Sequence, residues 1–493
     1  MPSTRGRGQF NRLVLILILV LLLAFFPFIL QVIPDMEYAR RAIATGSYGE
    51  AASYLASAAE SQPWRMDLWE LAGQYALQNN DPQAAIHYLE HARQAATTKS
   101  ALTSLSPQFW ILLGDAYEKT GDLDAASSAW QSAAAAGASE QEVLLRQLRV
   151  HRLQGEYAAA VADMQAMIEL QPGDGSLHFQ LGLLMAAFQP RAALEPLEQA
   201  LKLDPTLAAP AKKMEQCIRA ASLASDDAYL LVNSGRCLAS LDEWDLAFQA
   251  FQLATQLRPD YAEAWAYLGE AQQHRSDLFA NHPEASAGLA ELTKALELNP
   301  KSEAAYTFLA LYWLRQQKYE PALQAILSAA SLDPDNPVLQ AELGNILASS
   351  GKLNEAHQAY EQAISLAPKD PQYWRRLAAF SLNYSYQLDQ VALPAARQAV
   401  NLAPQDTENL DLIAQVLIRL SDLVSAERFL ARALQIDTNY VPAHLHLGLI
   451  YALQGNPQAA LTEFNLVLSL APESPMAEQA RRLIEIYGIE PNQ

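Results

Sequence analysis

Residues 110–133 decide the fold, and they read WILLGDAYEKTGDLDAASSAWQSA. Gly114 in the first half and Ala126 in the second are small, so two helix backbones can approach closely at these positions. Tyr117 and Trp130 are large enough to fill the space beside that contact. Gly121 lies between the two halves, where a residue without Cβ can take the positive φ of a tight turn. The stretch therefore predicts a hairpin of two packed helices.

The same pattern recurs along the chain. Seven of the eleven spacings between successive first-helix small positions are 34 residues, and the others are 36, 41, 41 and 53. A small residue in the second helix accompanies each one, and a proline ends nine of the second helices. Leu148 is the only one of the twelve first-helix positions that is not a small residue. The first-helix positions are Ala39, Gly73, Gly114, Leu148, Gly182, Gly235, Gly269, Ala310, Gly344, Ala378, Ala414 and Gly448.

The pattern Trp110-x2-Leu113-Gly114-x2-Tyr117, followed by a small, an aromatic and a small residue, resembles the tetratricopeptide repeat (TPR). The resemblance covers about residues 35–473, and 34 residues is the period of that family. It implies an all-α fold, a right-handed superhelical α-solenoid of about twelve helix-turn-helix repeats. It also implies a scaffold that binds other proteins or peptides.

The irregular spacings divide the array. We expect repeats 1–5 in residues 35–206, a spare linker helix in 207–226, and repeats 6–12 in 227–473. Residues 474–493 read as a C-terminal capping helix and tail, because a solenoid needs a polar end. Extra residues are expected after a second helix at 95–107, between two helices at 274–286, and as a two-residue addition near 384–390.

The N-terminus suggests an anchor. A basic tail, residues 1–12, precedes the uncharged run 13–33, whose 21 residues would span about 30 Å as a helix, the thickness of a bilayer core. The run is longer than the apolar part of a signal peptide, so we predict an uncleaved transmembrane signal anchor. Arg5, Arg7 and Arg12 favour a cytoplasmic N-terminus and an extracytoplasmic body. The predicted protein is thus a single-pass membrane protein of bacterial type, and a cytosol-facing adaptor of the same fold is the alternative.

Composition narrows the function classes. Residues 1–34 hold three Arg and no acidic residue, so residues 35–493 carry 31 basic and 54 acidic side chains. Such a surface repels phosphate backbones, and we expect no nucleic-acid partner. Only Cys217 and Cys237 occur and they form no CxxC pair, which excludes a zinc ribbon; whether the two pair with each other stays open. No cofactor is predicted, and the oligomeric state is not fixed by the sequence.

The resemblance implies that the first helices line a groove in which peptides lie. Many of the expected groove residues are arginines in an otherwise acidic chain, and guanidinium groups hold carboxylates well. The alternative is that these arginines pair with neighbouring glutamates and only make the helices soluble. The candidate partner-binding residues are Arg149, Arg152, Phe179, Tyr229, Arg236, Arg315, Asn345, Arg375 and Arg419, with Leu382, Leu445 and Leu449 on the same expected face.

Catalytic motifs are scarce. His87-Tyr88-Leu89-Glu90-His91 matches H-x-x-E-H, which places two histidines on one helix face and raises a zinc-dependent hydrolase as an alternative function. The motif lies in the second helix of a repeat beside the small residue Ala85, however, and we interpret it as a solvated helix face. The sequence holds no phosphate loop and no nucleophile elbow. We therefore predict no enzyme activity, no catalytic residue and no metal site.

Overall fold

The computed structural model describes residues 32–62, 65–98, 105–278 and 288–488. Within these ranges the regular secondary structure is helical, and no strand occurs. The chain divides into two compact units, Met1–Ser225 and Asp226–Gln493, which we describe one at a time. The prediction of an all-helical solenoid of tetratricopeptide-type hairpins is confirmed for both.

The N-terminal unit is a series of helix pairs followed by one more helix. Residues 32–44 are helical and pack with the helix that follows them. Each later first helix packs against its second helix, as α3 does with α4. The elements are α2 (Tyr48–Ser61), α3 (Met66–Gln78), α4 (Pro82–Thr98), α5 (Pro107–Thr120), α6 (Leu123–Ala135), α7 (Glu140–Gln154), α8 (Tyr157–Leu170), α9 (Gly175–Ala186), η1 (Pro190–Ala193), α10 (Leu194–Leu203), η2 (Pro205–Leu207) and α11 (Ala208–Ala221).

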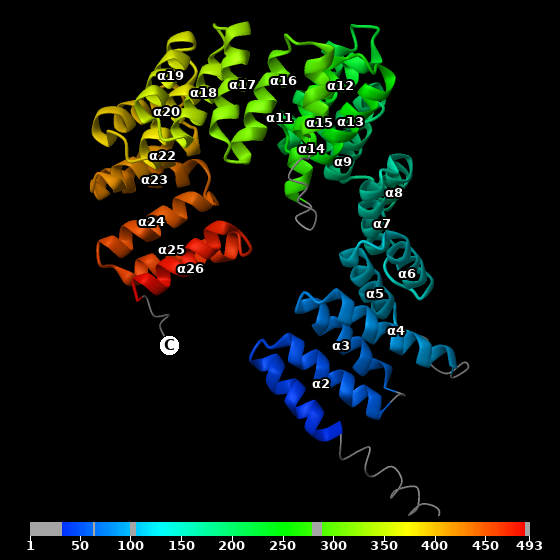
Figure 1. Cartoon of the computed structure of the whole chain (residues 1–493). Helices are drawn as coiled ribbons and strands as arrows, with labels where there is room; N and C mark the ends of the chain where they lie inside the picture. Colours follow the sequence, from blue (N-terminus) through cyan, green and yellow to red (C-terminus); the bar gives the residue numbers. More distant parts are fainter. Residues whose placement is uncertain (1–31, 63–64, 99–104, 279–287, 489–493) are drawn as a thin grey trace, which may run out of the picture. The chain divides into compact units, whose positions relative to one another are not determined.

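The described part of the C-terminal unit holds seven hairpins and a last helix, α26; Figure 1 shows α16 beside α17 and α24 beside α25 as two of these pairs. The elements are α12 (Asp227–Ala239), α13 (Trp244–Leu257), α14 (Ala262–Leu278), α15 (Leu289–Leu298), α16 (Glu303–Arg315), α17 (Tyr319–Leu332), α18 (Pro337–Ser349), α19 (Leu353–Leu366), α20 (Pro371–Asn383), η3 (Leu388–Ala392), α21 (Leu393–Leu402), α22 (Thr407–Arg419), α23 (Leu423–Ile436), α24 (Val441–Leu453), α25 (Pro457–Leu470) and α26 (Pro475–Ile486).

Small residues hold each hairpin together. A Cβ built on Gly235 of α12 would lie 2.5 Å from the Phe251 ring of α13, so the absence of a side chain is what lets the ring fill this space. Trp130 of α6 packs in the same way over Gly114 of α5 and is fully buried. Gly121, which closes α5, has a φ of 83°, as its place in the sequence predicts. The repeated pattern therefore encodes the helix contacts themselves.

Polar residues begin the helices and account for part of the acidic composition. The Asp406 side chain accepts hydrogen bonds from the backbone N–H groups of Glu408 and Asn409, and so caps α22. Asp226 and Asp370 cap α12 and α20 in the same way. These carboxylates are also stabilised by the positive end of the helix dipole. Many acidic residues of the turns thus have a local structural role.

Two of the irregular spacings appear as local departures from the regular hairpin. α14 has 17 residues where α12, α16 and α18 have 13, so part of the extra sequence lengthens a helix. The turn after α20 holds Ser385 and Gln387 at φ values of 52° and 45°, and a π-helical turn, η3, precedes α21. Left-handed residues other than glycine and π turns are both uncommon. The two added residues near 384–390 are absorbed there.

The predicted membrane span is not supported. Among the described residues, no helix is both long enough and apolar enough to cross a bilayer. Residues 13–31 of the predicted anchor lie outside the described residues, and the helix of residues 32–44 carries Asp35, Glu37, Arg40 and Arg41. The single-pass localisation, with the orientation inferred from it, is therefore corrected: the apolar run in the sequence is not matched by a spanning helix in the described structure.

Candidate partner-binding face

The first helices of successive hairpins form one layer of the C-terminal unit. α14 contacts α12 and α16, and α20 contacts α18 and α22, in addition to the second helix of its own hairpin. We call the exposed side of this layer the first-helix face. Residues six before and one after the small residue recur on this face, whereas the position three before it is mostly buried, as in Val232, Ala266, Ala341 and Leu445. The predicted groove residues fall on or near these offsets.

In the N-terminal unit the predicted residues lie on α7 and α9. Arg149 forms an ion pair with Glu118 of α5, so it joins two successive first helices. Arg152 is partly buried one turn further along α7, and Phe179 is partly buried on α9. Arg149 is therefore already neutralised by an acid of the preceding repeat.

Tyr229 and Arg236 lie on the first helix of the C-terminal unit. Tyr229 is 39% exposed, while Arg236 lies 3.8 Å from the Glu263 carboxylate and 5.3 Å from the centre of the Tyr267 ring. A guanidinium over an aromatic face is favourable, though weakly so at an exposed site. Arg236 thus also faces groups of the next repeat.

Arg315 belongs to a buried polar cluster. Its Nη2 lies 2.7 Å from Oε1 of Glu270, and its Nη1 lies 3.2 Å from Oε2 of the same carboxylate and 2.5 Å from Oε1 of Gln273. Glu270 and Gln273 are each 5% exposed. His274 completes the cluster, with Nε2 3.1 Å from Glu270 and its ring stacked on Trp244 at 3.6 Å.

The charge state of Glu270 follows from these contacts. Burial alone would raise the pKa of its carboxyl group, because a charged form is costly away from water. Hydrogen bonds from His274 and Arg315, together with their charges, outweigh burial and hold the pKa below its ordinary value. Glu270 is therefore an ionised, fully bonded carboxylate that ties α14 to α16.

Arg375 lies in a more open cluster. Its Nη1 is 3.1 Å from Oδ2 of Asp406 and 2.8 Å from Oε2 of Glu408, both at the start of α22. Arg419 is exposed and donates a hydrogen bond to Oγ of Ser385 at 2.6 Å. Asn345 is partly buried on α18. The structure thus brings Arg375 and Arg315 each to acids of a neighbouring repeat rather than to one common site.

Three leucines of the expected face differ among themselves. Leu382 and Leu445 are 6% and 2% exposed and belong to the core, so the expectation that they line a groove is wrong for these two. Leu449 is partly buried. Leu382 lies four residues after Ala378 and Leu445 lies three residues before Gly448, and both pack in the hydrophobic core.

Sequence reasoning missed one group on the same face. Asp411 of α22 is 5% exposed and accepts from Gln415 at 2.8 Å, and its other oxygen lies 2.6 Å from Nδ1 of His446 on α24. An ionisable residue three before the small position, followed 35 residues later by a histidine, is the signal that would have found this pair. The contact between Asp411 and His446 links α22 to α24, which are the first helices of the last two hairpins.

The H-x-x-E-H motif forms no metal centre among the residues described. His87 and His91 have ring centres 4.6 Å apart, and His91 stacks on Trp69. Glu90 accepts a hydrogen bond from the Tyr117 hydroxyl at 2.9 Å and another from Nε of Arg93 at 2.9 Å. No cluster of three or more potential metal ligands occurs in the described ranges. The glutamate is thus bonded to neighbouring side chains, which gives the zinc-hydrolase alternative no structural support.

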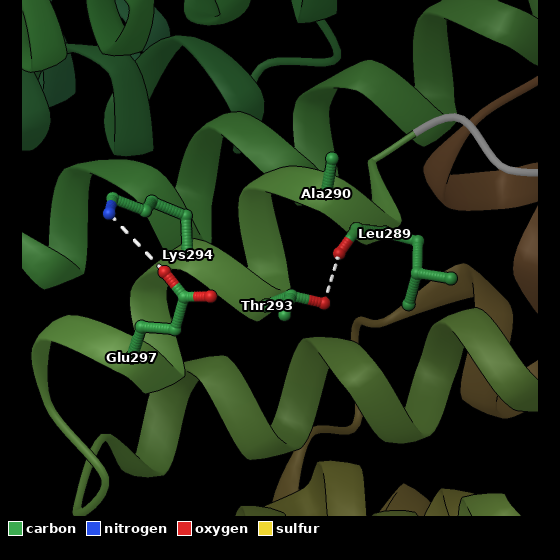
Figure 2. A pocket seen from close by; sticks show the side chains of 5 residues that line it. All are labelled: Leu289, Ala290, Thr293, Lys294 and Glu297. Carbon is green, nitrogen blue, oxygen red and sulfur yellow. Dashed lines mark hydrogen bonds and ion pairs between the residues drawn. The ribbon is translucent and has the colours of Figure 1, made fainter.

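A hollow of about 540 Å³ lies beside α15 and is lined by Leu289, Ala290, Thr293, Lys294 and Glu297 (Figure 2). The Thr293 hydroxyl donates to the Leu289 carbonyl at 2.8 Å, and Lys294 lies 3.2 Å from Glu297. Figure 2 shows that these side chains all come from one helix. Their polar groups bond to one another, so this hollow does not define a site.

Family models confirm the nature of the repeats. Models described as tetratricopeptide repeat match residues 38–101, 105–175, 275–337, 314–379 and 441–474. Together these ranges cover more than half of the chain. The chain belongs to the tetratricopeptide-repeat family, whose folds bind other proteins or peptides.

Similar proteins match this chain over part of their own length. The human protein O-mannosyl-transferase TMTC1 is 26% identical over 194 residues, which is 38% of this chain and 21% of that protein. The peroxisomal targeting signal receptor of Komagataella phaffii is 27% identical over 197 residues, 31% of this chain and 32% of the receptor. The chain therefore spans about a fifth to a third of these relatives.

Two solved structures resemble this chain at low sequence identity. Yeast Tom70 matches with 18% identity over 87% of this chain and 96% of its own, at a TM-score of 0.43. The protein YrrB matches with 23% identity over 39% of this chain and 97% of its own, at a TM-score of 0.30.

Proposed function

We propose that this protein is an interaction scaffold that binds partner proteins or peptides through its first-helix face. The packing of first helices on one another supports this most directly, because α12, α14 and α16, and likewise α18, α20, α22 and α24, lie side by side in the C-terminal unit. Repeat arrays use such extended surfaces for binding. The similarity to a receptor for a targeting signal agrees with this role.

The predicted groove residues support binding by this face, but most of the arginines among them are already paired with acids. Tyr229, Asn345 and Phe179 offer uncharged contact area, whereas Arg149, Arg236, Arg315 and Arg375 are engaged with acids of adjacent repeats. Breaking such a pair to hold an acidic ligand would forfeit the existing contact. The proposed face therefore binds through shape and uncharged groups as well as through charge.

The test compares one substitution on each side of a hairpin in the full chain. Asn345→Arg places a long cation on the first-helix face, and Gln358→Arg places the same side chain on the exposed side of α19. In crosslinking and pull-down experiments, we expect partners of the wild type to be recovered by the α19 variant and lost from the α18 variant. Recovery of the same partners by both variants would overturn the proposed face.

A further inference from the structure

The first-helix face has an uncharged stretch in the middle of the C-terminal unit. On α16 this stretch includes Ala304, Thr307 and Leu311, and on α18 it includes Val338 and Asn345, whereas Ala341 between these two is fully buried. Val338 is 45% exposed and is the most accessible apolar side chain of this stretch. Gln372, at the same offset on α20, is also uncharged and is held by Asp370 at 2.7 Å. This stretch offers an apolar contact without competing charges.

The next repeat ends that stretch with carboxylates. Asp406, Glu408 and Asp411 lie at the start of α22, and Arg375 is the cation that pairs with two of them. Both oxygens of Asp411 are engaged by Gln415 and His446, whereas the Glu408 side chain is 65% exposed. Glu408 is thus the carboxylate that a partner can reach.

The pKa of Tyr440 reports the electrostatic environment of these carboxylates. Burial raises the pKa of Tyr440, and Asp411, Glu408 and Asp406 raise it further, while Arg375 lowers it. Burial is the largest cause of the raised pKa, and three carboxylates, opposed by one guanidinium, add to it at this end of the layer. A positive charge is therefore favoured here.

Val338 and Glu408 lie at equivalent positions on two first helices of the layer. Val338, Gln372 and Glu408 each lie six residues before the small residue of their repeat, so they occupy equivalent places on α18, α20 and α22. Packed helices lie 8–10 Å apart, so two steps along the layer span about 20 Å. An extended peptide covers that distance with about six residues.

We propose that the C-terminal unit binds an extended peptide segment of another protein, with an apolar side chain over Val338 and a Lys or Arg side chain against Glu408, about six residues apart. The inference rests on the proposed scaffold function and names its partner class. It reverses the charge that an arginine-lined groove suggests, because Arg149, Arg236, Arg315 and Arg375 are paired with acids of the array, whereas Glu408 stays mostly exposed.

The test uses fluorescence anisotropy with the full chain and three labelled synthetic peptides. The first carries Leu and, six residues later, Arg in a Gly/Ser background; the second replaces Arg by Glu, and the third replaces Leu by Ser. We expect the first to bind about 10-fold or more tightly than the second, since one contact becomes repulsive. Its affinity should also exceed that of the third by about 10-fold, the worth of one buried apolar side chain.

Variants locate the site. Glu408→Gln should weaken binding of the Leu/Arg peptide by about 5-fold to 10-fold and reduce its salt dependence. The matched control Glu361→Gln removes an equally exposed carboxylate, 61% exposed, from the second helix α19 and should change nothing.

Two outcomes overturn the inference: equal or tighter binding of the Glu peptide, and no measurable binding of the Leu/Arg peptide. An unchanged affinity of the Glu408→Gln variant would also overturn it. None of these results would touch the scaffold role, which fails only if partner recovery does not depend on Asn345.

Discussion

Arg315 and Arg375 show how differently two similar joints of the array are built. Both guanidinium groups are 33% exposed, and both reach an acid of a neighbouring repeat. The Glu270 side chain that faces Arg315 is 7% exposed, whereas those of Asp406 and Glu408, which face Arg375, are 31% and 65% exposed. The arginines are alike, so the burial of their acids decides what each joint contributes.

The comparison separates stability from recognition. A buried ion pair adds little net stability over an apolar contact, but losing one partner strands the other charge away from water. An exposed pair contributes little either way and leaves its carboxylates accessible to a ligand. The joint at Arg315 should therefore hold α14 to α16, and the joint at Arg375 should present charge to a partner.

The largest expected effect is that of Arg315→Ala. It leaves Glu270 buried with only His274 and Gln273 as neighbours, and we expect a loss of about 3–5 kcal/mol in the unfolding free energy of the C-terminal unit. Urea unfolding followed by tryptophan fluorescence measures it.

The double variant Glu270→Leu/Arg315→Leu is the control for that experiment. It removes both charges, and we expect it to be more stable than Arg315→Ala, because no unpaired charge remains. If the single and double variants lost equal stability, the buried charge would not be the cause, and the comparison between the two joints would fail.

The next effect is a pH dependence located at Glu270. Its folded-state pKa is lowered, so its stabilising contribution is present above the unfolded value of about 4.3 and is lost as the pH falls through the folded value. We expect the unfolding free energy of the wild type to fall more steeply than that of Glu270→Gln as the pH drops below about 4.3. Parallel pH profiles, with Glu361→Gln as the exposed reference, would show that the carboxylate contributes no such term.

The smallest effect is that of Arg375→Ala on stability. The pair is exposed at its acid side, so we expect a change of about 0–1 kcal/mol in the unfolding free energy. The same variant should bind the Leu/Arg peptide at least as tightly as the wild type, since Glu408 loses a competing cation. A destabilisation as large as that of Arg315→Ala would erase the distinction between the joints.

The fold was predictable because its determinants are local and periodic. Gly114 with Trp130, and Gly235 with Phe251, lie 16 residues apart and repeat at a fixed interval, so their contact can be read from spacing alone. The structure of the insertions was not predictable from the sequence. The lengthening of α14 and the π turn η3 depend on packing between hairpins.

The chemistry of the candidate face was less predictable. Arg315 pairs with an acid 45 residues earlier and Arg375 with acids 31 and 33 residues later, so no single spacing identifies the partners. Whether a guanidinium is available depends on these contacts. The sequence therefore indicated which residues lie near the face, but not which charges remain accessible on it.

Hydrogen exchange of the full chain, with and without the Leu/Arg peptide, tests the central claim most directly. Binding at the first-helix face should slow amide exchange in α18, α20 and α22 and leave the second helices α19, α21 and α23 unchanged. Protection confined to the second helices, or spread equally over both layers, would contradict the account.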